Sequence, residues 1–250
     1  MTTTNIQRRK TAPDMAFVAF VVIAAVTLLL YKIPALRRLS YPLIHLSTLV
    51  HELGHGIAGI LVGGEFKEFR MYEDASGVAF VTRPEGNIRS AIISAGGLVG
   101  PAIAAAFGFV FTRRAKTARI GLAIIGGFLI LAELLWIRTT FGQVFVAIVA
   151  AICIGVAIQR VAALSQFVLM FLSVQLSLSV YSRGDYLFTK SAGSMPSDVA
   201  NMATALGGPY WLWGGVCAAI SAASLLLGVF LMLRRDGSAK PLASAAKMKL

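Results

Sequence analysis

The sequence predicts an all-α polytopic membrane protein with about six to seven transmembrane helices and a small β-hairpin between the second and the third. Composition is the first observation behind this expectation. Of 250 residues, 57% are hydrophobic and only 14% are charged, and the mean hydropathy is +0.78. An ordinary soluble domain carries about 25% charged residues, so this chain falls outside that class. The second observation is that the apolar residues form runs close to the roughly twenty residues that cross a bilayer as a helix.

The net charge of +12 fits a membrane protein better than a nucleic-acid-binding one. Basic residues fall mainly between the apolar runs and at the two chain ends, where a membrane protein meets lipid headgroups. There is no basic patch on a polar domain, so we expect no nucleic-acid partner. The expected surroundings are the lipid bilayer of a bacterial cell (inner) membrane. Cys153 and Cys217 each lie in an apolar run and are expected to be buried structural residues.

The first part of the chain predicts two helices and a hairpin. Residues 1–14 form a polar tail, and the apolar run 15–31 predicts a retained anchor because no small-x-small cleavage site follows it. Ser40 and Pro42 are typical of a helix start, and Gly63-Gly64 is typical of a helix end. Residues 65–84 are polar, with two short apolar-aromatic runs around the turn at 74–77, and this pattern predicts a β-hairpin.

The later part of the chain is a series of apolar runs, which bring the predicted number of spans to about seven. The runs are Ile88–Phe111, Ile120–Ile137, Phe141–Ile158, Val161–Val180 and Trp211–Leu233. Pro101 lies inside the first of them, where we expect it to kink or loosen the helix. Residues 15–233 are expected to form a single intramembrane domain, and residues 234–250 a basic C-terminal tail.

The second apolar run contains His51-Glu52-Leu53-Gly54-His55, an H-E-x-x-H pattern. Positions i and i+4 of a helix differ by roughly 40° of rotation, so His51 and His55 project from one face and can hold one metal ion. Glu52 lies beside that face, where a general base for hydrolysis is needed. Two packing histidines are the alternative, but ionisable groups in a membrane-length helix are costly and usually functional. His51 lies roughly 14 Å from Pro42 along the helix, near the middle of a roughly 30 Å hydrocarbon layer.

A catalytic zinc ion usually takes three protein ligands and keeps one position for water, so the two imidazoles need a third partner. His45 is six residues before His51, roughly 240° around the helix, and is expected to be a packing residue. The acids in or beside apolar runs are Glu133, Asp185 and Asp198. Asp198 or its neighbour is a natural helix cap, whereas Asp185 has no such role. Asp185 is therefore the favoured ligand and Asp198 the alternative, while Glu133 is the weakest of the three and also suits a proton relay or a helix contact.

These features together resemble the site-2 protease family of intramembrane zinc metalloproteases. The shared features are HELGH in an early apolar helix, a hairpin-like segment, the Gly-Pro-containing AGGLVGP span and a late aspartate, and the match is best over 42–101. The resemblance implies that His51 and His55 are zinc ligands, that Glu52 is the base, and that a late aspartate completes the site. In that family the aspartate commonly stands in Leu-Asp-Gly, a tripeptide that this chain lacks. The YSRGD and PSDV stretches are instead similar to a compact branch with Tyr-Ser-x-x-Asp followed by Ser-Asp and without a PDZ-like domain.

The function expected on these grounds is zinc-dependent intramembrane proteolysis, with one Zn²⁺ per chain. The expected substrate is a membrane protein whose transmembrane segment contains helix-breaking residues, because a helical peptide bond is shielded by its own hydrogen bonds. The hairpin either pairs with the extended substrate by strand addition or is a solvated loop. The alternative function is a catalytically inactive, metalloprotease-like membrane protein that binds metal or clients. A transporter is the weakest alternative, because it would need paired broken helices and several acids along a path.

Overall fold

The structure is a computed structural model that describes residues 15–33, 36–82, 85–159, 161–182, 185–193 and 195–234. Within these ranges the chain forms seven helices of 18 or more residues. They are α1 (Met15–Lys32), α2 (Arg37–Leu61), α3 (Asn87–Phe111), α4 (Ala115–Leu135), α5 (Thr140–Ile158), α6 (Ala162–Ser182) and α9 (Tyr210–Leu233). Of these, α3, α4, α5 and α9 are each long and apolar enough to cross a membrane. The predicted all-α membrane fold is confirmed.

The start of α2 differs from the sequence prediction, whereas the end of α3 agrees with it. Helix α2 begins at Arg37, so Pro42 lies inside its first two turns instead of at its start. Proline has no backbone N–H, so the bond from this position to the carbonyl four residues earlier is missing. Helix α3 continues through Pro101 to Phe111. The predicted tails, residues 1–14 and 234–250, lie outside the described part of the chain apart from Arg234.

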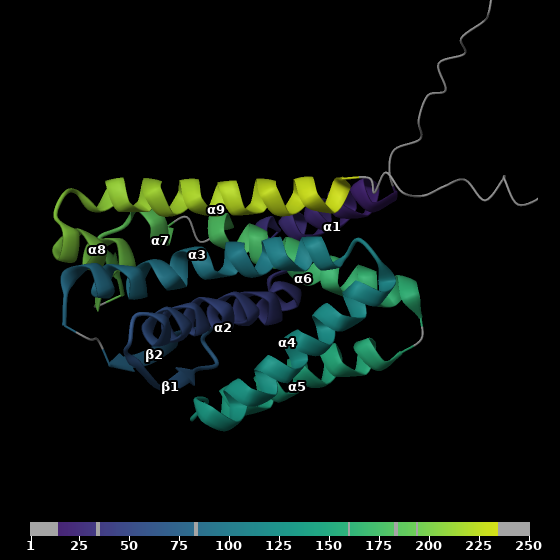
Figure 1. The fold of residues 1–250 in the computed structure, drawn as a ribbon, viewed down its shortest axis with the longest axis horizontal. Helices are drawn as coiled ribbons and strands as arrows, with labels where there is room; N and C mark the ends of the chain where they lie inside the picture. The colour runs from purple at the N-terminus through teal and green to yellow at the C-terminus, as the bar shows by residue number, and fades with distance from the viewer. Residues whose placement is uncertain are drawn as a thin grey trace, which may run out of the picture.

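The long helices pack in successive layers (Figure 1). Helix α9 lies along one side, α3 lies next to it, and α2 lies beyond α3, while α4 and α5 form a pair that leans away from the rest. Helix α3 is the central element, because it packs against α2, α6, α9 and the short helix α8 (Asp198–Leu206). The beginning of α1, the end of α9 and the turn from α3 into α4 all lie at the same end of the molecule.

The predicted hairpin is present between α2 and α3. Strands β1 (Glu65–Met71) and β2 (Gly77–Thr82) pair antiparallel, from Glu65 opposite Thr82 to Met71 opposite Gly77, with an irregularity between Phe66 and Glu68. In the turn, the Asp74 carboxylate accepts hydrogen bonds from the hydroxyl and the backbone N–H of Ser76, and these bonds lower the pKa of Asp74 below its usual value. A second, much shorter pair joins β3 (Ser191–Ala192) to β4 (Met195–Pro196), after the four-residue helix α7 (Asp185–Phe188).

The outer edge of β1 is covered by the turn between α4 and α5. The Phe69 N–H donates to the Trp136 carbonyl at 2.7 Å, and the Arg138 N–H donates to the Phe69 carbonyl at 3.1 Å. The Phe66 ring stacks on Trp136, and Phe69 and Ile137 are fully buried. These contacts fix the hairpin to the helix pair, while both of its strands also contact α2.

Two buried clusters hold the site between them. The larger one contains Leu49, Leu53, Phe69 and Ile137, and joins α2 to the hairpin and to the α4–α5 turn. The smaller one joins α3, α8 and α9 through side chains that include Leu98, Val199, Met202 and Cys217. Both cysteines are buried, as predicted. Helix α8 is thereby fixed against α3 on the side that α2 also approaches.

Candidate metal centre

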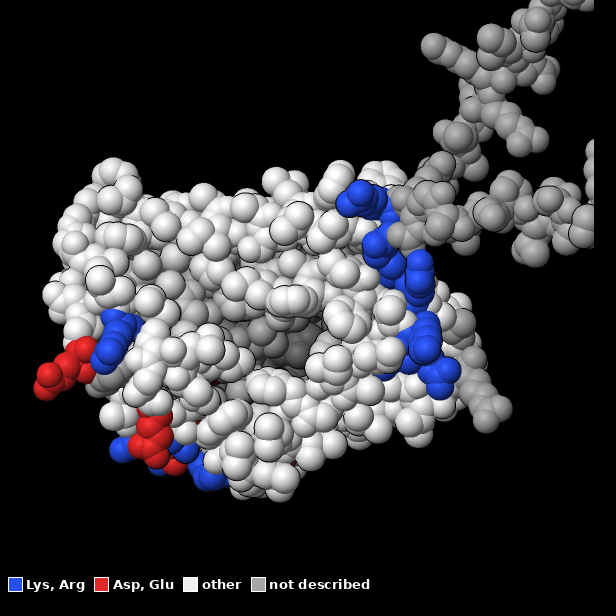
Figure 2. Space-filling view, in the orientation of Figure 1, with Lys and Arg blue, Asp and Glu red and all other residues white. Residues whose placement is uncertain are grey.

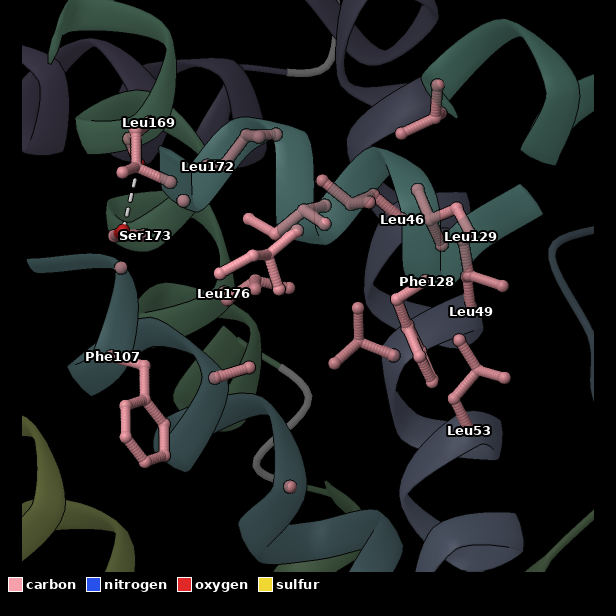
Figure 3. Close-up of a pocket in the computed structure, with 18 of the residues that line it drawn as sticks. Leu46, Leu49, Leu53, Phe107, Phe128, Leu129, Leu169, Leu172, Ser173 and Leu176 are labelled. Carbon is pink, nitrogen blue, oxygen red and sulfur yellow. Dashed lines mark hydrogen bonds between the residues drawn. The ribbon is translucent and has the colours of Figure 1, made fainter. Parts of the chain in front are cut away.

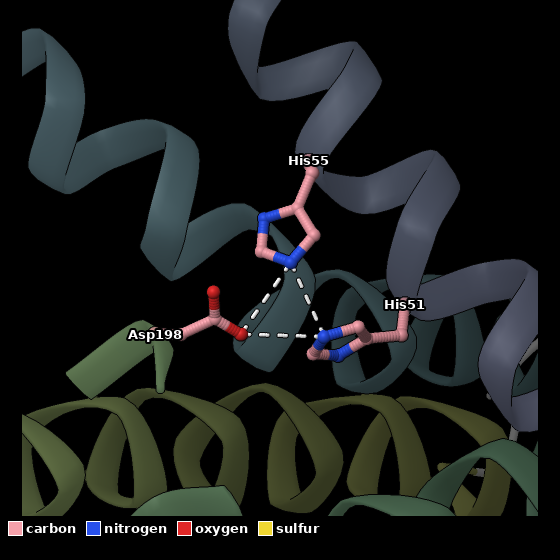
Figure 4. Close-up of side chains that lie close together, drawn as sticks. All are labelled: His51, His55 and Asp198. Carbon is pink, nitrogen blue, oxygen red and sulfur yellow. Dashed lines mark hydrogen bonds and ion pairs between the residues drawn. The ribbon is translucent and has the colours of Figure 1, made fainter. Parts of the chain in front are cut away.

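Two histidines of α2 and the first residue of α8 meet at one point (Figure 4). Oδ2 of Asp198 lies 3.2 Å from Nε2 of His51 and 3.4 Å from Nε2 of His55, and the two Nε2 atoms are 3.2 Å apart. Among the described residues, these three side chains form the group of His, Cys, Asp and Glu that is able to hold a metal ion. His51 and Asp198 are 147 positions apart in the sequence but lie side by side in the fold.

The spacing of the three atoms fits a tetrahedral ion. Zinc binds nitrogen and carboxylate oxygen at about 2.0–2.2 Å in tetrahedral geometry, which places neighbouring ligand atoms about 3.3 Å apart. The observed separations of 3.2, 3.2 and 3.4 Å match that edge length. Two imidazoles and one carboxylate are also a donor set that zinc accepts in catalytic sites, where the fourth position stays open. The residues present therefore fit zinc.

The local structure around Ser197 leaves the Asp198 carboxylate available. Ser197 is the N-cap of α8, and its hydroxyl oxygen accepts a hydrogen bond from the Ala200 N–H at 3.2 Å. The sequence allowed either Ser197 or Asp198 to cap this helix, and the structure shows that Ser197 is the cap. Asp198 occupies the first turn of the helix, and its side chain points to the two histidines instead.

The other two acids stand differently. Asp185 begins α7, but its side chain is not among those that the structure describes, so its role as a ligand stays a prediction. Glu133 lies in α4 and lines a groove between α4 and α5, among apolar residues that include Leu129 and Ala150. The weak candidate therefore lies away from the site.

His55 is held in one orientation by α3. Its Nδ1 lies 2.7 Å from the Ile93 carbonyl, which can only accept a hydrogen bond, so Nδ1 carries the proton. Nε2 is left unprotonated in the neutral ring and faces the cluster. A backbone carbonyl that fixes the tautomer of a histidine in this way is typical of metal ligands.

Glu52 is held by the hairpin. Its Oε2 accepts a hydrogen bond of 2.8 Å from the Ala79 N–H in β2, and the residue is only 9% exposed. The hairpin comes this close because Gly77 has no side chain: a Cβ there would lie 2.7 Å from the Thr48 methyl and 2.9 Å from Cγ of Glu52. The carboxylate beside His51 therefore has one oxygen bound to β2.

Glycines let α3 approach α2 at the level of the site. A Cβ on Gly96 would lie 2.5 Å from the Gly54 carbonyl oxygen, and a Cβ on Gly97 would collide with the imidazole of His55. Only glycine is compatible with these backbone distances. The AGGLVGP segment thus brings the Ile93 carbonyl within reach of His55.

A comparison of the sequence with protein families finds a match to the Peptidase M50B-like family over residues 18–228. The chain belongs to the Peptidase M50B-like family. This membership confirms the predicted relationship to site-2 proteases and makes the protein a member of a family of membrane metalloproteases. The matched span contains His51, His55 and Asp198. Comparisons with curated proteins and with solved structures give no match.

The third histidine of this Peptidase M50B-like chain has the packing role that the sequence predicted. His45 is fully buried, and its two ring nitrogens lie 2.9 Å from the Tyr41 carbonyl and 3.2 Å from the Tyr72 carbonyl. Its ring also packs beside Phe141 and Phe145 of α5. It ties α2 to the hairpin and to α5, away from the metal centre.

Sequence reasoning missed the two backbone groups that orient the site of this family member. The Ile93 carbonyl fixes His55, and the Ala79 N–H fixes Glu52. Every residue has such groups, so no residue type marks them in a sequence. The nearest signal was indirect: the glycines at 96, 97 and 77 indicate close backbone approach but do not say which polar group is brought near.

Proposed function

We propose that this protein is a zinc-dependent intramembrane endopeptidase that hydrolyses peptide bonds in or near transmembrane segments of membrane proteins. His51, His55 and Asp198 hold the zinc ion, and Glu52 is the general base. The observation that carries this proposal is the set of separations between the three ligand atoms, 3.2 to 3.4 Å, next to a carboxylate on the same helix. Family membership supports the same chemistry.

The chain's own groups supply the proton transfers. A bound zinc ion would lower the pKa of water to about 7 and polarise the scissile carbonyl. Glu52 takes a proton from the attacking water and later gives it to the leaving amine, so that each peptide bond is replaced by one carboxyl and one amine. The Ala79 N–H occupies Oε2 of Glu52, so Oε1 is the oxygen that we assign to this exchange.

The substrate that we propose is a membrane protein with a helix-breaking transmembrane segment. An unwound segment exposes its backbone groups, and strand addition to a sheet edge satisfies them. The edge of β1 is already bonded to residues 136–138, whereas the edge of β2 lies next to the assigned base, with its Ala79 N–H bonded to Glu52, so a substrate strand would pair with the other outward groups of β2. Strand β2 is therefore the edge on which we place the substrate, in a bilayer that we expect to be the bacterial cell (inner) membrane.

Elemental analysis of purified protein in detergent tests the metal assignment. We expect about one zinc per chain in the wild type, as catalytic sites of this kind hold. His51→Ala and Asp198→Asn should lose the metal, while Asp185→Asn is the matched control and should keep it. Loss of zinc in Asp185→Asn with retention in Asp198→Asn would overturn the assignment of the third ligand.

Proteolysis of a reconstituted membrane-protein substrate tests the activity. The wild type should cleave a transmembrane substrate that contains a Gly or Pro in its span. This cleavage should stop when a chelator removes the zinc. A protein that holds zinc but shows no turnover against such substrates would favour the alternative function, an inactive relative that binds metal or clients.

A further inference from the structure

A large apolar cavity lies between α2, α3, α4 and α6, and none of His51, His55 and Asp198 lines it (Figure 3). Its volume is about 470 Å³, within the range of roughly 300–1,000 Å³ that small-molecule sites have. Leu46, Leu49 and Leu53 line it from α2, and Phe107, Phe128 and Leu172 line it from α3, α4 and α6. Leu53 is rotated roughly 200° from His51 around the helix axis, so the cavity and the metal site are separate.

The apolar lining of this cavity is complementary to a hydrocarbon ligand. Among the described residues that line it, Ser173 alone has a polar side chain, and its hydroxyl already donates to the Leu169 carbonyl at 2.8 Å. The lining therefore offers a polar ligand atom only the hydroxyl oxygen of Ser173, as an acceptor. Water is also disfavoured, because it needs two to four polar partners in such a space.

The cavity opens toward the bilayer. Phe107 of α3 and Ile124 of α4 line it and are nevertheless 65% and 58% exposed. Both helices are long and apolar enough to cross a membrane, so their exposed side chains face lipid. Figure 2 shows the resulting hollow in the middle of one face of the molecule.

A row of basic residues lies at the end of the molecule where α3 turns into α4. Lys and Arg side chains line the end at which α3 turns into α4, whereas the acidic side chains visible on this face lie toward the opposite end (Figure 2). That turn contains Arg113, Arg114 and Lys116. Phe107 precedes Arg113 by six residues and Ile124 follows Lys116 by eight, so each is roughly 9–12 Å along its helix from a positive charge.

We propose that this cavity binds one acyl chain of an anionic phospholipid whose phosphate lies against Arg114 and Lys116. The acyl chain fills the space between α2, α3, α4 and α6, and the headgroup meets the basic turn at the membrane surface. Basic residues near a membrane surface attract anionic lipids, and basic pockets beside transmembrane helices bind their headgroups. The lipid then supports the packing of α4 against α2 without touching the metal centre.

Native mass spectrometry in detergent tests this site with phosphatidylglycerol and phosphatidylcholine that carry identical acyl chains. The wild type should retain phosphatidylglycerol in preference. Arg114→Gln and Lys116→Gln should each lower that preference roughly fivefold. Arg89→Gln, which removes an exposed charge from the first turns of α3 at the other end of the molecule, is the matched control and should leave the preference unchanged.

Filling the cavity tests the acyl chain. Ala104 lines the cavity and is exposed within it. Ala104→Phe should therefore abolish retention of both lipids. If that variant does not elute as a monodisperse protein, the smaller Ala104→Leu takes its place and should reduce retention. Ala123→Phe adds the same ring to an exposed position of α4 that does not line the cavity, and should bind lipid like the wild type.

Two results would overturn the proposal. They are equal retention of the two lipids by the wild type, and unchanged retention in a monodisperse Ala104→Phe or Ala104→Leu variant. An Ala104→Phe variant that keeps its lipid but loses proteolysis of a membrane substrate would mean that the cavity receives a polypeptide. The lipid measurements do not depend on zinc or on hydrolysis, so they stand apart from the test of the proposed function.

Discussion

The backbone N–H of Ala79 donates a hydrogen bond of 2.8 Å to Oε2 of Glu52. This bond joins the hairpin to the carboxylate that we assign as the base. Ala79 stands opposite Phe69 in the hairpin, and both residues direct their backbone groups outward, Ala79 toward α2 and Phe69 toward the α4–α5 turn. One strand pair therefore positions Glu52 on one side and is itself fixed on the other.

Ala79→Pro should impair catalysis without loss of the metal. Proline removes the N–H that binds Glu52, and the ladder bonds of β2 are spared because this N–H does not take part in them. A hydrogen bond to a charged group contributes about 1.5–3 kcal/mol, so we expect kcat to fall roughly tenfold to a hundredfold. Ala79→Ser keeps the N–H and is the control. Equal kcat values for the two variants would show that the bond does not position the base.

Glu52→Gln should abolish most of the hydrolysis and leave the fold intact. The amide oxygen of glutamine still accepts the Ala79 N–H, but glutamine cannot take a proton from water. Removal of a general base costs roughly 100- to 10,000-fold in kcat. The assay is cleavage of a reconstituted transmembrane substrate, with zinc content measured on the same sample. Wild-type turnover in this variant would mean that another group is the base.

The helices and the motif were predictable because their signals are local. Apolar runs of membrane length located α3, α4, α5 and α9, and the i, i+4 spacing placed His51 and His55 on one face of α2. The hairpin also has a local signal, two short apolar-aromatic runs around a turn. The start of α2 was placed too late, because a proline that is typical of the first turn can also stand one turn further in.

The position of Asp198 was not predictable, because it depends on contacts far apart in the sequence. Asp198 was placed second because either it or Ser197 could cap α8, and the cap is Ser197, one position earlier. Helix boundaries predicted from sequence are uncertain by one or two residues, and a shift of one residue exchanges the roles of Ser197 and Asp198. Packing of α8 against α3 then brings the carboxylate to α2, and no spacing rule reports that.

Gly96→Ala should weaken the packing of α3 against α2. Its Cβ would lie 2.5 Å from the Gly54 carbonyl oxygen, so the helices must separate, and overpacking of this kind costs about 1–3 kcal/mol. Gly127→Ala is the matched control, because a Cβ there meets nothing within 4 Å, and alanine should stabilise α4 by up to about 1 kcal/mol. Thermal unfolding in detergent measures both. A Gly96→Ala protein as stable as Gly127→Ala would contradict the close approach of α2 and α3.

Thr139→Val should loosen the hairpin while the metal site stays intact. The Thr139 hydroxyl donates to the Met71 carbonyl at 2.8 Å, and its oxygen accepts from the Met71 N–H at 3.1 Å and from the Gly142 N–H at 3.3 Å, as the N-cap of α5. Valine has nearly the same shape but removes all three bonds, and loss of a helix cap alone costs about 0.5–2 kcal/mol. Thr139→Ser keeps the hydroxyl and is the control.

Hydrogen exchange distinguishes this effect from general destabilisation. In Thr139→Val the amide of Met71 should exchange faster, because it loses the oxygen that it donates to, whereas amides in the middle of α3 should keep their protection. Zinc content should equal that of the wild type, since the ligands come from α2 and α8 and not from the α4–α5 turn. Slow exchange of the Met71 amide in the valine variant would mean that the turn does not hold the end of β1.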